Sequence, residues 1–276
     1  MKKAICHYSF HRRWDAEKWD ANRLAEEVRN LGVEGVDFHV RYLKTPAEAP
    51  SLILNAIGKH GLVLSGLSMS NDFNTDDPAK FKQQVDAVKN WVPVIDKVRA
   101  PVSRIFGGHL PPEQRLDAAA KAKGRQRILD ALEIILREAE KHGIVFALEN
   151  HGGLPCTGEE QVDVIKTVNS PLLRATIDVG NYMQGGQEGH VGTKVAAEYC
   201  AYVHFKDFRK VKDETKPWGW TIEACTVGDG DVDHPACIAE LQKIGYDGFI
   251  ALEYEGPEDE QTGVPRSVDY MNKVMP

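Results

Sequence analysis

The stretch IVFALEN at residues 144–150 is a short apolar run that ends in a charged residue, Glu149. Three later runs have the same form: ATIDVGN contains Asp178, YVHFKDF contains His204, and FIALEYEG contains Glu253. A parallel strand covered by helices is almost continuously hydrophobic, so four polar residues at equivalent places need a compensating partner. Three carboxylates and one imidazole suit a divalent cation. The four runs therefore predict one metal site.

The side chains within each run alternate between two faces, as they do in a β-strand. Val145, Ala147 and Glu149 share one face of the first run. Phe146 and Leu148 lie on the other face. In the other three runs, too, the larger aliphatic side chains lie mostly on one face and the polar residue ends the other. If the aliphatic faces meet a layer of helices, the four polar groups converge at one end of the sheet.

The chain alternates short apolar runs with amphipathic segments from end to end. The expected strands lie at 3–8, 33–38, 62–68, 102–107, 144–149, 174–179, 201–207 and 248–254. The expected helices lie at 16–31, 48–60, 78–98, 112–142, 158–168, 191–200, 234–244 and 265–274. Eight β-then-α units, without a GxGxxG motif after an early strand, predict a single (β/α)8 TIM barrel spanning residues 1–276. Residues 208–233 form an insertion of the kind that serves as a lid or substrate loop.

Composition and charge exclude some classes of function. The chain has 34 basic and 41 acidic residues and a net charge of −7, which argues against a sequence-independent nucleic-acid binder. The start, MKKAICHYSFHRRWD, lacks the apolar core of a secretory signal, and the sequence contains no apolar run of the roughly 18 residues that span a bilayer. Five cysteines without a CxxC pair indicate reduced thiols. We expect a cytoplasmic protein without a nucleic-acid or membrane partner.

The motifs FALEN, TIDVGN, VHFKD, GDGDVD and FIALEYEG resemble those of the xylose isomerase-like TIM-barrel superfamily of sugar isomerases, epimerases, inosose dehydratases and endonuclease IV-type enzymes. The resemblance implies that Glu149, Asp178, His204 and Glu253 bind one divalent metal ion, with Mn, Mg, Co and Zn left open. It also implies that Glu149 and Glu253 are the catalytic acid and base. Such a pair removes a proton α to a ketone and returns it, while the metal stabilises the enediolate.

Three residues near these motifs are candidates for substrate contact. His151 follows Glu149 by two positions and is equally compatible with a loop role. Lys206 shares a strand face with His204 and resembles the lysine of the HxKD motif in dehydratase-like members. Asn181 stands where several ketose epimerases and the endonuclease IV group carry histidine, and an asparagine side chain is a poor zinc ligand. This difference argues against a site that binds several zinc ions.

Two further candidates lie outside the four metal runs. His109 ends the run RIFGGHL and either faces the site or lies in a solvated loop. Trp218, with Trp220, lies in the insertion, where an indole ring either stacks on a sugar or packs the insertion onto the barrel. The sequence leaves both alternatives open for each residue.

The leading functional hypothesis is a metal-dependent isomerase or epimerase of a small-molecule ketose or keto-polyol. A lyase that dehydrates an inosose-like or 3-keto sugar is the alternative, because it begins with the same proton abstraction. Lys206 favours the lyase, and the paired glutamates favour the epimerase. An endonuclease IV-type phosphodiesterase is least favoured, because Asn181 replaces a histidine and the chain is acidic. The oligomeric state stays open, and a homo-oligomer is compatible with the sequence.

Overall fold

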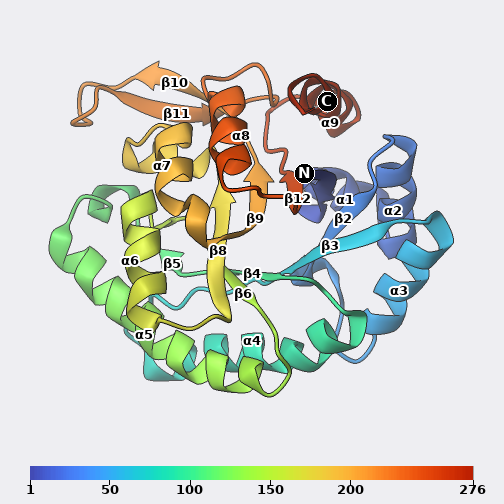
Figure 1. The fold of residues 1–276 in the computed structure, drawn as a ribbon, viewed down its shortest axis with the longest axis horizontal. Helices are drawn as coiled ribbons and strands as arrows, with labels where there is room; N and C mark the ends of the chain where they lie inside the picture. The colour runs from blue at the N-terminus through green and yellow to red at the C-terminus, as the bar shows by residue number, and fades with distance from the viewer. Residues whose placement is uncertain (276) are drawn as a thin grey trace.

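The computed structural model describes residues 1–275 and contains one sheet of eight parallel strands. Its strands are β1 (Lys2–Cys6), β2 (Gly35–His39), β3 (Val63–Ser68), β4 (Ser103–Phe106), β6 (Phe146–Glu149), β8 (Leu173–Asp178), β9 (Cys200–Phe205) and β12 (Phe249–Leu252). Their order in the sheet is β3-β2-β1-β12-β9-β8-β6-β4. Each strand overlaps one of the eight expected from the sequence, and the (β/α)8 prediction is confirmed (Figure 1).

The sheet curls until its edge strands, β3 and β4, meet. There the backbone N–H of Met69 donates a hydrogen bond to the carbonyl oxygen of Arg104 at 2.8 Å. On the other side of the ring, β1 pairs with both β2 and β12. Lys3 Nζ also donates to Asn272 Oδ1 at 2.9 Å, so segments near the two ends of the chain lie together.

The inside and the outside of the barrel carry different side chains, as the alternation predicted. Small residues and two aromatic rings form an inner cluster: Ala4, Val102, Ala147, Tyr202, Phe249 and Ala251. Phe146 and Leu148, which neighbour Ala147, belong instead to the large outer core. A Cβ atom at Gly35 would lie 2.7 Å from the Phe249 ring, so β2 requires glycine where that ring crosses the interior.

Nine α-helices of residues 1–275 flank the sheet on the outside (Figure 1). They are α1 (His11–Glu17), α2 (Ala21–Asn30), α3 (Ala49–His60), α4 (Pro78–Val98), α5 (Ala118–Glu140), α6 (Gly158–Val168), α7 (Gly189–Ala196), α8 (His234–Lys243) and α9 (Glu260–Val274). No helix in this range is both long and apolar enough to cross a membrane.

Two expected helices differ at their amino-terminal parts. The helix expected over 16–31 is broken into α1 and α2, because Lys18 takes a left-handed conformation with φ of 55° and Asp20 caps the new start. The helix expected over 112–142 begins only after Asp117, whose carboxylate accepts hydrogen bonds from two backbone N–H groups of the first turn of α5. In both cases an aspartate cap marks the true start.

The last helix and the insertion also depart from the simplest expectation. Helix α9 begins at Glu260, before the expected range 265–274, and continues through Pro265. The insertion contains an antiparallel hairpin of β10 (Phe208–Lys212) and β11 (Trp220–Ala224). A second short ribbon pairs β5 (Gly108–His109) with β7 (Gly153–Leu154). The hairpin lies beside α7 in Figure 1.

Candidate metal centre

The four residues predicted to bind a metal meet at one place. Glu149 ends β6, Asp178 ends β8, His204 lies in β9, and Glu253 directly follows β12. These four strands are consecutive neighbours in the sheet. One ligand-type atom from each residue lies within 4.8 Å of the others, and the residues are between 0% and 6% exposed. The cluster lies toward the carboxyl ends of the strands, where the active sites of this fold are built.

The His204 ring lies between carboxylates on both of its sides. Its Nδ1 atom is 3.1 Å from Glu149 Oε1 and 3.3 Å from Glu253 Oε2. Its Nε2 atom is 3.5 Å from Asp37 Oδ2 on β2. Burial would lower the pKa of His204, but these carboxylates outweigh burial and raise it well above the ordinary value. Only Nδ1 faces the glutamates of the predicted metal set.

Two buried cations border the cluster. Arg104 on β4 places Nε 3.2 Å from Glu149 Oε2. Lys206 places Nζ 2.8 Å from Glu253 Oε2 and 3.3 Å from Asp178 Oδ2. Burial would lower the pKa of Lys206, but Asp178 and Glu253 raise it well above its ordinary value, so the ammonium stays charged. Lys206 therefore points inward, as the shared face with a metal ligand suggested.

The donor set fits a divalent cation. The buried cluster contains four carboxylates and two permanent cations: Asp37, Glu149, Asp178, Glu253, Arg104 and Lys206. The carboxylates, if all ionised, exceed these two cations by two charges, and the excess is one while His204 is protonated. One oxygen on each of the three predicted carboxylate ligands accepts no hydrogen bond of good geometry within residues 1–275. Burial raises the pKa of Asp178 to about 7 despite Lys206, and a bound cation would keep that carboxylate ionised.

The two predicted acid–base glutamates are held ionised. Burial would raise the pKa of Glu149, but Arg104 and His204 outweigh it and bring the pKa to about 2. Burial acts in the same direction on Glu253, and there Lys206 and His204 lower the pKa well below the ordinary value. Each carboxylate therefore begins as a proton acceptor.

Two of the predicted substrate residues lie next to the cluster. The His151 ring lies 4.2 Å from the Phe106 ring, and the Arg104 guanidinium lies over the same phenyl ring at 3.9 Å. Burial lowers the pKa of His151 to about 4, so its imidazole is neutral near pH 7. Asn181 is buried, and its backbone N–H donates to Asp178 Oδ1 at 2.9 Å. Asn181 thus helps to orient a predicted metal ligand.

The structure does not bring the other two predicted substrate residues into contact with the cluster. His109 is exposed on the β5–β7 ribbon, where its carbonyl oxygen accepts a hydrogen bond from Asn74. The Trp218 ring packs so closely on Gly186 that a Cβ atom there would overlap it. Trp218 also helps to line a separate cavity of about 220 Å³. Substrate contact by either residue stays a prediction.

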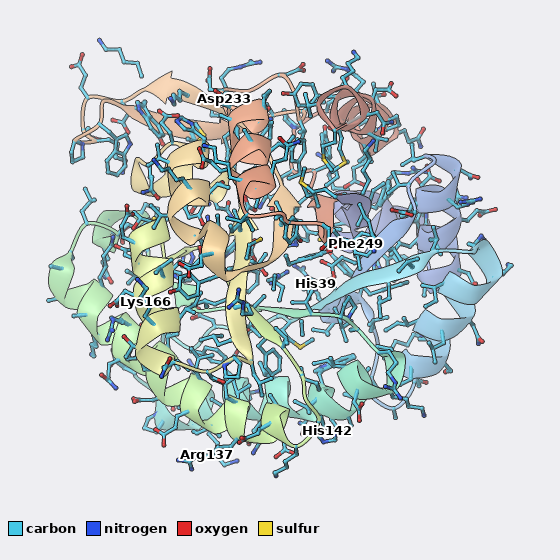
Figure 2. All side chains as sticks on the ribbon, viewed as in Figure 1. His39, Arg137, His142, Lys166, Asp233 and Phe249 are labelled. Carbon is cyan, nitrogen blue, oxygen red and sulfur yellow. The ribbon has the colours of Figure 1, made fainter. Side chains whose placement is uncertain are left out.

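Three residues of the site were missed by the sequence reading: Asp37, His39 and Arg104. His39 ends β2, is 5% exposed, and lies near the centre of the molecule in Figure 2. Its Nδ1 accepts a hydrogen bond from the backbone N–H of Arg41 at 3.1 Å, which leaves the proton on Nε2. Burial lowers the pKa of His39 well below its ordinary value. The available signal was polar residues that interrupt the apolar runs GVDFH and SRIF, with only His39 at the end of its run.

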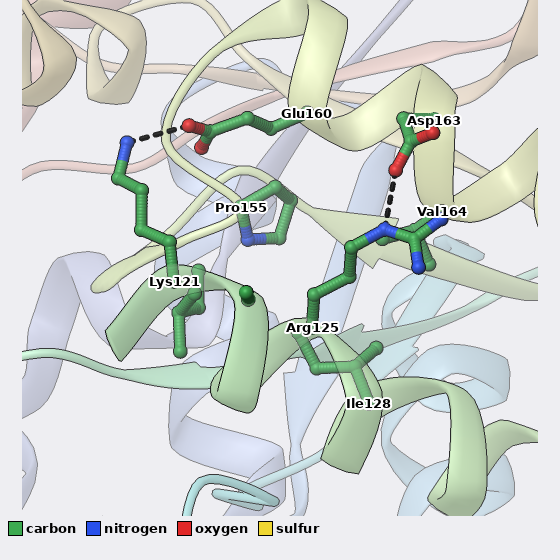
Figure 3. A pocket seen from close by; sticks show the side chains of 9 residues that line it. Lys121, Arg125, Ile128, Pro155, Glu160, Asp163 and Val164 are labelled. Carbon is green, nitrogen blue, oxygen red and sulfur yellow. Dashed lines mark hydrogen bonds and ion pairs between the residues drawn. The ribbon is translucent and has the colours of Figure 1, made fainter. Parts of the chain in front are cut away.

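A separate hollow lies on the outer wall of the barrel, between α5 and α6. Figure 3 shows the ion pairs Lys121–Glu160 and Arg125–Asp163 that cross it. Its volume is about 110 Å³, and none of the four predicted metal ligands lines it. This hollow is a groove between two packed helices and not part of the carboxylate cluster.

Comparison with known proteins yields relatives that modify sugars. An inosose dehydratase from Bacillus licheniformis is 29% identical over 150 residues, which cover 49% of this chain and 48% of that protein. A ketose 3-epimerase from Arthrobacter globiformis is 24% identical over 208 residues, which cover 72% of this chain and 66% of that protein. The chain spans about half the length of the first curated relatives that it matches, at 43% and 48%.

The fold is shared with solved structures over almost the whole chain. A D-tagatose 3-epimerase-like protein superposes with a TM-score of 0.77 and 17% identity, covering 99% of this chain and 98% of that one. The family model described as the xylose isomerase-like TIM barrel matches residues 25–274. Because this match includes all eight barrel strands except β1, the chain belongs to the xylose isomerase-like TIM-barrel family.

Proposed function

We propose that this protein is a divalent-metal-dependent isomerase or epimerase of a ketose-type sugar. The observation that carries the proposal is the pair Glu149 and Glu253, whose carboxylates lie 3.1 and 3.3 Å from the same nitrogen of His204. Both are buried and ionised, and they come from strands on either side of the metal set. One carboxylate can accept the proton α to a carbonyl, and the other, after it takes up a proton from solvent, can deliver that proton to the opposite face.

A divalent ion held by Glu149, Asp178, His204 and Glu253 would stabilise the negative charge of the enediolate. The chain's own residues then define the surroundings of the sugar. Lys206 and Arg104 keep the two proton-carrying carboxylates ionised. The neutral His151 imidazole, held against Phe106, offers one donor and one acceptor to a sugar hydroxyl. The site thereby combines proton carriers with neutral hydrogen-bonding groups.

The test is solvent-deuterium incorporation into a panel of ketoses, keto-polyols and 3-keto sugars with added Mn2+, followed by NMR. Deuterium at the carbon α to the carbonyl, with all hydroxyls retained, is the expected result. Glu149→Gln and Glu253→Gln should each abolish conversion of the exchanging substrate to product while the variants remain folded by circular dichroism, because an amide can neither accept nor return the proton. A Glu253→Gln variant that forms product at the wild-type rate would remove this residue from the acid–base pair.

A metal-dependent lyase of an inosose-like or 3-keto sugar is the second candidate. The observation that favours it is the Lys206 ammonium, which lies 2.8 Å from Glu253 Oε2 inside the cluster. A fixed positive charge next to the proton carrier stabilises a departing hydroxide, which an epimerase does not release. The similarity to an inosose dehydratase agrees with this reading.

The same deuterium experiment separates the two candidates. Loss of one water from a substrate, seen by mass spectrometry, would assign the lyase reaction. In that case Lys206→Met should reduce water loss more than it reduces α-proton exchange, because the ammonium acts after proton removal. Equal losses of both steps would show that Lys206 supports the shared step instead.

A further inference from the structure

The fully buried carboxylate of Asp37 has no role in the proton transfers proposed above. It lies on β2, across the His204 ring from the two acid–base glutamates. We propose that Asp37, together with Ser68, is a positioning pair that holds the His204 imidazole with Nδ1 directed to the metal. This inference rests on the proposed metal centre and deepens it.

The two nitrogens of His204 have different surroundings. Nδ1 faces Glu149 and Glu253 at 3.1 and 3.3 Å, which is the side of the predicted metal ligands. Nε2 faces Asp37 Oδ2 at 3.5 Å and no other acidic group within residues 1–275. A neutral imidazole carries its proton on one nitrogen only. With a cation bound on the glutamate side, Nδ1 cannot keep a proton, and the carboxylate at Nε2 then stabilises the tautomer in which Nε2 carries the proton and Nδ1 presents its lone pair to the cation.

Asp37 is itself held by the neighbouring strand. The Ser68 hydroxyl, on β3, donates a hydrogen bond to Asp37 Oδ2 at 2.7 Å. Gly66 lies opposite Asp37 in the β2–β3 register, where a Cβ atom would approach Asp37 Oδ1 to 3.3 Å. The sheet thus leaves space for this carboxylate and fixes it with one hydroxyl.

The cost of burying the Asp37 carboxylate agrees with this role. The residue is 0% exposed, and a buried carboxylate is costly unless donors satisfy it. Within residues 1–275, Ser68 supplies the only hydrogen bond of good geometry to its carboxylate, and His204 is its only ion-pair partner. The Nε2–H group of His204 is the remaining donor. In proteins, such a carboxylate behind a metal-bound histidine orients the ring and increases its basicity.

A competing role for the same atoms is a second metal site. Donor atoms of Cys6, Asp37 and His204 also lie within 4.8 Å of one another. A metal there would need the thiolate of Cys6. In the structure the Cys6 thiol instead donates a hydrogen bond to Glu253 Oε1 at 4.0 Å, which requires the protonated thiol. The positioning role requires no such change and is therefore preferred.

The test measures Mn2+ binding to the full chain by calorimetry, independent of any substrate. Asp37→Asn should raise the dissociation constant for Mn2+ by about 10- to 100-fold, which is the range seen when a hydrogen-bonding partner of a metal ligand is lost. The matched control is Glu260→Gln, a buried carboxylate on α9 that is bound by Arg12 and touches no residue of the cluster. The control should leave Mn2+ affinity at the wild-type value even if it lowers the melting temperature.

Two further measurements test the positioning role independently of the Asp37→Asn variant. Ser68→Ala retains the charge of Asp37 and should weaken Mn2+ binding by a smaller factor, so it decides the question if Asp37→Asn does not fold. Long-range 15N–1H NMR of the Mg2+-loaded protein should show the His204 proton on Nε2. A proton on Nδ1 would overturn the proposal.

The outcomes separate the positioning role from the metal centre. Suppose that the wild type binds one Mn2+ and that Asp37→Asn binds it as tightly as the Glu260→Gln control does. The positioning role then fails and the metal centre stands. Ser68→Ala is compared with the control in the same way if Asp37→Asn does not fold. If the wild type binds no Mn2+, both fail. If it binds two and Asp37→Asn binds one, the second metal site replaces the positioning pair.

Discussion

His7, the first residue after β1, shows what a buried histidine does to stability. Its ring is 0% exposed and lies 4.3 Å from the Trp14 ring and 4.4 Å from the Tyr42 ring. Burial lowers the pKa of His7 to about 3. The imidazole is therefore neutral in the folded protein over a pH range in which it takes up a proton in the unfolded chain.

This difference predicts a pH-dependent stability. Between pH 7 and pH 5 the unfolded state binds more protons than the folded state, so the free energy of unfolding falls by about 2 kcal/mol because of His7. Urea denaturation at the two pH values measures the fall. In His7→Asn the fall between pH 7 and pH 5 should be smaller than in the wild type by about 2 kcal/mol. His109 is exposed, and His109→Asn should show the same fall as the wild type. An unchanged fall in His7→Asn would contradict the prediction.

The residues of the site differ in how far the sequence reveals them. Glu149 and its three companions stand out because each interrupts an apolar run at the same place. Asp37 and Arg104 also interrupt runs, but their partners lie on other strands. Which strands face one another across the interior depends on how the sheet closes. A pattern within one run does not contain that information.

At the scale of elements, one carboxylate organises the loop that leads into α8. Asp207 Oδ2 accepts hydrogen bonds from the backbone N–H groups of Gly228 and Gly230 at 2.8 and 3.0 Å, and Oδ1 accepts one from Val232 at 3.2 Å. A Cβ atom at Gly230 would lie 2.2 Å from Asp207 Oδ1, so the loop closes around the carboxylate only with glycine there. Lys206 points into the cluster while its neighbour holds this loop.

Asp207→Ala should therefore release the loop. Three backbone donors of the loop and the N–H of Phe208 lose a charged acceptor, and we expect the free energy of unfolding to fall by roughly 2–4 kcal/mol. Hydrogen–deuterium exchange should rise specifically over residues 226–233. Glu214→Gln, in the exposed connection of the β10–β11 hairpin, is the control and should change neither quantity. Unchanged exchange over the loop would show that other contacts hold it.

The element boundaries show where local patterns mislead. All eight strands were predictable, because apolar runs of that length recur with helical segments between them. The break at Lys18 was not, since a lysine with positive φ carries none of the glycine signal that marks helix ends. Pro265 led to a predicted start of the last helix that lies too late in the chain. A proline usually marks a helix start, whereas here it lies within α9.

For the whole molecule, a metal that binds residues from four strands should stabilise the fold. We expect Mn2+ at 100 times its dissociation constant to raise the free energy of unfolding by about 2.7 kcal/mol. Thermal denaturation with Mn2+ and with a chelator measures the difference. His204→Ala should remove most of the effect. Equal melting temperatures with and without Mn2+ in the wild type would count against the metal centre.

The pairing of β1 with β12 has a consequence for how the protein is made. Lys2 on the first barrel strand pairs with Phe249 on the last barrel strand, so the ring cannot close until the ribosome has added β12. Glu253 follows that last strand. A nascent chain therefore carries three of the four predicted metal-binding residues only once His204 has been added, and it gains the fourth just after the last barrel strand. Barrel closure and completion of the predicted cation-binding set therefore depend on the same last strand.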